Sequence, residues 1–153
     1  MRLLCMLLLL AVAIAPSAAE AHSHKRKGLE IVHPWTSATL TAGAAVAVCM
    51  KIKNRSGAPE RLIGASTAAA MKTELLEGGG EGGAGVPKPV AAILIAPGTD
   101  TALARNGPHL LLSGMKRRLN AYESFKLVLV FEKAGRITVD VAVEETEEEP
   151  AKP

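Results

Sequence analysis

The stretch FKLVLVFEKAGRITVDVAV, residues 125–143, decides the fold class. Apolar side chains occupy every second position over 125–131 and again over 137–143, which is the pattern of β-strands with one buried face. Residues 133–135 between the two runs are typical of a hairpin turn, with Gly135 supplying a positive φ. The stretch therefore predicts an antiparallel β-hairpin.

The rest of the chain repeats this pattern in shorter pieces. Further strands are expected at 29–32, 44–53, 62–66, 72–77, 90–95 and 110–112, separated by breakers at 54–59, 97–98 and 106–108. Short strands between regularly spaced turns predict an antiparallel β-sandwich. A helical turn at 68–71 would be too short to change the class. The run GGGEGGAG, residues 78–85, predicts a flexible loop, because each glycine loses much backbone entropy on ordering.

The first residues of the chain are typical of a secretory signal. Arg2 precedes an apolar run at 3–14, which is too short to span a bilayer. Small residues then allow cleavage after Ala19 or after Ala21. We therefore expect residues 1–21 to direct export to the periplasm and then to be removed.

The mature chain is expected to hold one folded domain between two polar ends. Residues 22–28 are a His-containing basic tail, residues 29–143 the β-sandwich domain, and residues 144–153 an acidic, disordered tail. Cys5 would leave with the signal, so Cys49 would be the only thiol. Its place in an apolar strand predicts that it is buried.

Composition excludes some classes of function. The net charge is +3, and aromatic residues make up only 3% of the chain. An exported protein with so few rings for base stacking is not expected to bind nucleic acid. The basic runs at 25–27 and 116–118 would suit anionic lipid or an acidic partner. No Ser/His/Asp set, carboxylate-pair motif or phosphate loop is visible in the sequence, so we do not expect an enzyme.

Several segments together resemble the PCu(A)C family of exported copper chaperones, which serve the copper-A centre of cytochrome oxidase. They are HPWTSAT (33–39), AAVAVCMKIKN (44–54), ERLIGASTAAAMKTELLE (60–77), GPHLLLSGMKRRL (107–119) and KLVLVFEKAGRITVDVAV (126–143). The resemblance covers about residues 29–143. It implies a cupredoxin-like, antiparallel Greek-key β-sandwich, in agreement with the strand pattern.

The resemblance also implies where copper ligands should lie. The family holds Cu(I) with two histidines and two methionines, and thioether sulfur is a soft ligand that suits Cu(I). The first histidine falls on Leu76, and the methionine hairpin falls on VPKP at 86–89. The last element, HxM, falls on His109 and Leu111. One of the four ligands, His109, is retained, so we expect a degenerate central site in which His109 has either a residual metal role or a structural one.

Two other residues of the resemblance are expected to be structural. Met115 falls on an apolar core position of the family, which predicts a core residue and not a substitute ligand. Trp35 matches the family tryptophan and is expected to pack in the core.

The segment EAHSHK, residues 20–25, offers a second candidate site. Cleavage after Ala21 would place His24 third in the mature chain, and cleavage after Ala19 would place His22 third. An N-terminal amine, two deprotonated amides and a third-position imidazole provide four nitrogens in a plane, which suits Cu(II). Binding would weaken as the pH falls, since the amides must lose protons. The alternative is a solvated tail.

These candidates leave two functions open. The first is an exported copper-binding protein, holding Cu(II) or Cu(I) through His22, His24 or His109, with an apo cytochrome oxidase subunit or another copper carrier as partner. The second is a metal-free sandwich that acts as an interaction or scaffold module. We expect a monomer without stable membrane insertion once the signal is removed. Fold alone does not choose between these functions, because function depends on the site.

Overall fold

The computed structural model describes residues 23–78 and 85–145, and all regular structure in these residues is β. The expected signal, His22, most of the glycine-rich run and most of the acidic tail lie outside the described residues. The strands are β1 (Ser23–Arg26), β2 (Leu29–Ser37), β3 (Val46–Asn54), β4 (Glu60–Ser66), β5 (Ala70–Glu77), β6 (Lys88–Pro89), β7 (Ile93–Ile95), β8 (Asp100–Leu103), β9 (His109–Met115), β10 (Ser124–Phe131) and β11 (Gly135–Glu144). No helix in the described residues is long and apolar enough to cross a bilayer.

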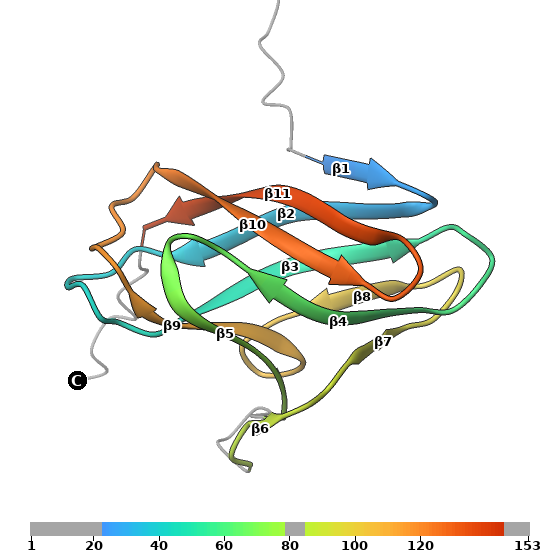
Figure 1. Cartoon of the computed structure of the whole chain (residues 1–153), viewed down its shortest axis with the longest axis horizontal. Coiled ribbons are helices and arrows are strands. Elements are labelled where there is room, and N and C mark those ends of the chain that lie inside the picture. Colours follow the sequence, from blue (N-terminus) through green and yellow to red (C-terminus); the bar gives the residue numbers. More distant parts are fainter. Residues whose placement is uncertain (1–22, 79–84, 146–153) are drawn as a thin grey trace, which may run out of the picture.

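The strands form one curled sheet that folds into two layers (Figure 1). Its order is β6-β5-β9-β3-β2-β11-β10-β4-β7, with β1 beside β2 and β8 beside β3. The two ends of this path, β6 and β7, lie on the same side of the molecule. One pair of strands is parallel, and the other pairs are antiparallel. The parallel pair is formed by the ends of β2 and β11, from Trp35 beside Ala142 to Ser37 beside Glu144. The predicted all-β sandwich is confirmed, with a mixed sheet in place of a purely antiparallel one.

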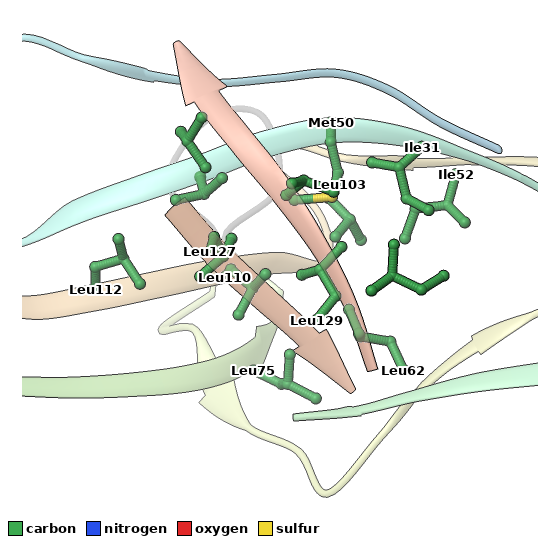
Figure 2. Packing of buried hydrophobic residues seen from close by; sticks show 14 of the residues in the cluster. Ile31, Met50, Ile52, Leu62, Leu75, Leu103, Leu110, Leu112, Leu127 and Leu129 are labelled. Carbon is green, nitrogen blue, oxygen red and sulfur yellow. The ribbon is translucent and has the colours of Figure 1, made fainter. Parts of the chain in front are cut away.

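The hairpin that decided the fold class forms as predicted. β10 and β11 pair from Ser124 opposite Ala142 to Phe131 opposite Gly135, and Gly135 has a φ of 76°. The alternating apolar residues of both strands are buried. They meet leucines of the other layer, including Leu75 and Leu110, in one continuous core (Figure 2). Each fully buried leucine of this kind contributes about 1.5–3 kcal/mol.

A bulge in β2 turns Trp35 away from this core. The pairing of β2 with β3 shifts between Val32 and Trp35, and His33 there has a φ of 49°. Trp35 is then the cross-strand partner of Cys49. Because Met50 belongs to the core and strand side chains alternate, Cys49 and Trp35 lie on the outer face of the sheet. The prediction that Trp35 packs in the core was therefore wrong.

The N-terminal segment differs from the tail that the sequence suggested. Ser23–Arg26 pairs with the start of β2, from Ser23 opposite Val32 to Arg26 opposite Leu29. Lys27 and Gly28 form the connection, with φ of 48° and 79°. Two positive φ values in a two-residue loop are typical of a type I′ hairpin turn, and the Lys-Gly pair is the local sequence signal for it. The proposed helical turn at 68–71 is a turn from which β5 starts at Ala70.

Candidate metal centre

The strand register brings the implied ligand positions together. On β5, Leu76 is the Cα partner of His109 on β9 and also of Pro89 on β6. Leu111 lies two residues beyond His109, on the same face of β9. The positions that the resemblance marked therefore share one region at the β6 end of the sheet. Leu76 and His109 are both buried there, with 7% and 5% of their surface exposed.

The ring of His109 is fixed by one backbone contact. Its Nδ1 lies 2.8 Å from the carbonyl oxygen of Gly107. A carbonyl can only accept, so Nδ1 carries the proton in the neutral ring and Nε2 keeps its lone pair. Histidines that bind metal commonly donate their other ring N–H in this way. The same bond also suits a structural histidine, so the two roles foreseen for His109 both fit this geometry.

The methionine side chains of the described residues lie in the core or elsewhere on the surface, and not beside His109. Met50 and Met115 are core residues with 4% and 1% exposure, which confirms the prediction for Met115. Met71 is 82% exposed on β5, but it lies five residues from Leu76. At the rise of a β-strand this corresponds to about 17 Å. Within residues 23–78 and 85–145, His109 thus has no thioether beside it.

The other candidate ligands lie elsewhere in the fold. His24 is on β1, and its Nε2 accepts a hydrogen bond of 3.4 Å from the backbone N–H of Asp140. His33 contacts Glu144, with 2.7 Å between Nε2 and Oε1. His22 is outside the described residues. The described part of the chain contains no group of three or more His, Cys, Asp and Glu side chains that could hold a metal ion.

The backbone of His24 has a further role in the β1–β2 ladder. In an antiparallel ladder that starts from a two-residue turn, the first and third residue pairs exchange hydrogen bonds. Arg26 and Leu29 are the first pair, and His24 and Ile31 are the third. The amide N–H of His24 is therefore expected to donate to β2.

Cys49 is buried in β3, as predicted, and is the free cysteine of the described residues. Burial raises the pKa of its thiol above the ordinary value, while the nearby charge and backbone N–H of Arg105 act in the opposite direction. This thiol lines a small, largely apolar hollow together with His33, Trp35 and Arg105. No local sequence signal points to this group, because it depends on the bulge in β2.

Comparison with known proteins gives a family. The model of the LpqE-like putative lipoproteins matches residues 29–143. The chain belongs to the LpqE-like family. No curated protein matches it.

Several solved structures share the fold of this LpqE-like chain. The copper-bound PCuAC domain from PmoF2 is 27% identical with a TM-score of 0.70, covering 81% of this chain and 98% of its own. The apo form of the same domain is 28% identical with a TM-score of 0.68, covering 82% and 97%. The solution structure of Cu(I)-bound DR1885 from Deinococcus radiodurans is 26% identical with a TM-score of 0.61, covering 84% and 85%. The resemblance to PCu(A)C domains in fold is thereby confirmed.

Proposed function

We propose that this LpqE-like chain is an exported copper-binding protein that delivers copper to an acceptor, as the PCu(A)C chaperones do. The observation that carries this proposal is the register that sets Leu76 opposite His109 and beside Pro89, in a fold similar to a copper-bound PCuAC domain. The expected signal at 1–21 and the description of the family as putative lipoproteins support export, and we propose the periplasm as the compartment. The acceptor would be an apo cytochrome oxidase subunit or another copper carrier. Delivery of this kind needs no catalysis by the chain.

We also propose that the central site is degenerate. A leucine stands at each of two implied ligand positions, Leu76 and Leu111, and prolines stand in the hairpin at Pro87 and Pro89. None of these side chains has a lone pair to offer Cu(I). A single imidazole, from His109, would therefore bind Cu(I) only weakly.

The N-terminal residues would then provide the stronger site, for Cu(II). Cleavage after Ala21 would require the amide nitrogen of His24 as a ligand. In the β1–β2 ladder, however, this amide N–H is expected to donate to the backbone carbonyl of Ile31. Cleavage after Ala19 would use the amides of Ala21 and His22, which precede β1 in the sequence. We therefore propose a mature start at Glu20, with the imidazole of His22 as the fourth nitrogen.

The test is a copper titration of the mature protein purified after export, with its first residue determined by mass spectrometry. His22→Ala should abolish the visible and electron paramagnetic resonance spectrum of four-nitrogen Cu(II), while His24→Ala and His109→Ala should leave it unchanged. A parallel Cu(I) titration against a competing chelator should show weak binding that depends on His109. If neither copper ion binds above background, the copper proposal is wrong.

The placement of the described methionines favours one alternative. Met50 and Met115 are in the core and Met71 is exposed elsewhere on β5, and a sandwich that retains the fold without these thioethers at its histidine would suit a metal-free interaction or scaffold module. Such a module would give flat titrations with both copper ions and would still bind a protein or membrane partner. The same experiment therefore separates the two functions.

A further inference from the structure

A hollow of about 1050 Å³ lies where the ends of β2 and β11 meet the start of β10. It is lined by Trp35, Ser37, Arg105, Tyr122, Glu123, Ser124, Asp140, Ala142, Val143, Glu144 and Glu145, which we call the acidic groove. None of these residues is one of the implied copper positions. The groove is therefore a feature of the fold that the proposed copper function does not use.

The groove gathers the surface aromatic residues of the protein. The chain contains one tryptophan, one tyrosine and two phenylalanines. Phe125 and Phe131 are in the core, whereas Trp35 and Tyr122 both line the groove. Together with Arg105, they are the residue types that most often dominate the energy of protein interfaces.

The backbone holds both aromatic side chains outward. The bulge at His33 reverses the direction of Trp35. Tyr122 is 83% exposed and has a φ of 68°, a conformation that costs energy in a residue other than glycine. A hydrogen bond of 2.8 Å from the N–H of Tyr122 to the carbonyl of Val143 fixes it against β11. The fold thus maintains an exposed ring beside the groove.

The charge of the groove is predominantly negative. Four carboxylates line it, from Glu123, Asp140, Glu144 and Glu145, against one cation, Arg105. Two of them contact cationic partners outside the lining, Glu123 at 2.6 Å from Arg117 and Asp140 at 2.6 Å from Lys126, and Glu144 lies 2.7 Å from Nε2 of His33. Such exposed ion pairs contribute little free energy, so an incoming cation can replace these partners.

We propose that the acidic groove binds a basic peptide segment, rich in lysine and arginine, of a partner protein. The carboxylates complement its charges, and the faces of Trp35 and Tyr122 attract its cations and cover their aliphatic stems. The hollow is at the upper limit of small-molecule pockets, which favours a peptide. This surface is independent of copper, so a failed copper titration would leave it intact.

Trp35 provides the measurement, because it is the only tryptophan of the chain. The probe is a short synthetic peptide in which lysine and arginine alternate with alanine, and its glutamate counterpart is the control. The basic peptide should change the emission of Trp35 saturably, and added salt should weaken the binding. The variant Glu144→Gln/Glu145→Gln should bind about threefold to tenfold more weakly. Arg105→Glu should bind more tightly.

The matched control is Glu77→Gln/Glu132→Gln, which likewise removes two carboxylates, from the end of β5 and from the β10–β11 turn, both outside the groove lining. It should bind the peptide as the wild type does. Equal losses in this control and in the groove variant would indicate non-specific attraction and overturn the proposal. A response to the acidic peptide, or none to the basic one, would also overturn it. Arg105→Glu is expected to bind the basic peptide more tightly, and Glu144→Gln/Glu145→Gln more weakly. Misfolding could explain a loss of binding but not the gain, so it cannot produce both results.

Discussion

Leu76 lies directly across the β5–β9 ladder from His109, and both side chains are buried. Opposite Cβ atoms in such a ladder are about 5 Å apart, which allows two imidazoles to share one metal ion. Leu76→His should therefore raise the affinity for Cu(I) by at least about tenfold, or ~1.4 kcal/mol. Competition with a Cu(I) chelator measures the change.

Lys72→His is the matched control for this gain. Lys72 lies on the same face of β5 as Leu76, but its cross-strand partner is Ser113. An added histidine there has no imidazole opposite it, so the Cu(I) affinity should stay at the wild-type value. Similar gains in the two variants would mean that the pairing with His109 is irrelevant. The gain from Leu76→His should also disappear when His109→Ala is added.

Glu60 connects β4 to the turn between β10 and β11. Its buried carboxylate accepts backbone N–H bonds from Arg61, Lys133 and Ala134 at 2.8, 3.0 and 2.9 Å. Burial alone would raise the pKa of Glu60, but these three donors outweigh it and lower the pKa below the ordinary value. Glu60→Gln should therefore reduce the free energy of unfolding by about 1–3 kcal/mol at neutral pH.

The stability lost in Glu60→Gln should depend on pH, and the pKa shift of Glu60 fixes the direction of this dependence. Because the pKa of Glu60 is lower in the folded state than in the unfolded state, its ionised carboxylate stabilises the protein at pH values above the unfolded-state pKa of about 4.3. This stabilisation is lost as the pH falls through the folded-state pKa. Urea unfolding should therefore show a smaller difference between wild type and Glu60→Gln at about pH 3 than at neutral pH. Glu132→Gln, whose exposed carboxylate is 3.7 Å from Arg61, should cost less than about 0.5 kcal/mol at either pH. Equal costs for the two variants would contradict this account.

The sequence predicted the strands well because their signal is local. Alternation of apolar residues marks the buried face of β10 and β11 without any knowledge of their neighbours. The bulge that turns Trp35 outward has no such signal, because one extra residue in β2 changes only its pairing with β3. The register that sets Leu76 opposite His109 likewise depends on strands far apart in the chain. The candidate site could therefore be described residue by residue, but its assembly and the acidic groove required the structure.

The type I′ turn at Gly28 predicts an unusual sensitivity to alanine. Gly28 has a φ of 79°, and a Cβ there would lie 2.8 Å from the Cα of Ser56. Gly43 has nearly the same φ, 80°, but a Cβ there would meet nothing within 4 Å. Gly43→Ala should cost about 1–2 kcal/mol for the left-handed backbone alone, and Gly28→Ala should cost distinctly more. Thermal unfolding of both variants measures the difference, and equal costs would show that the turn moves freely away from Ser56.

The thiol of Cys49 should react slowly, and its pH profile should report on Arg105. Burial raises the pKa of Cys49, so alkylation by iodoacetamide near neutral pH should be at least about tenfold slower in the folded protein than in urea. The charge of Arg105 partly offsets this effect, so Arg105→Ala should move the midpoint of the rate-against-pH curve upward. The midpoint is a better test than the rate, because removing a long side chain also opens access to the thiol. Arg61→Ala, which removes an exposed arginine of β4, should leave the midpoint unchanged. A midpoint that falls in Arg105→Ala would show that this arginine does not stabilise the thiolate.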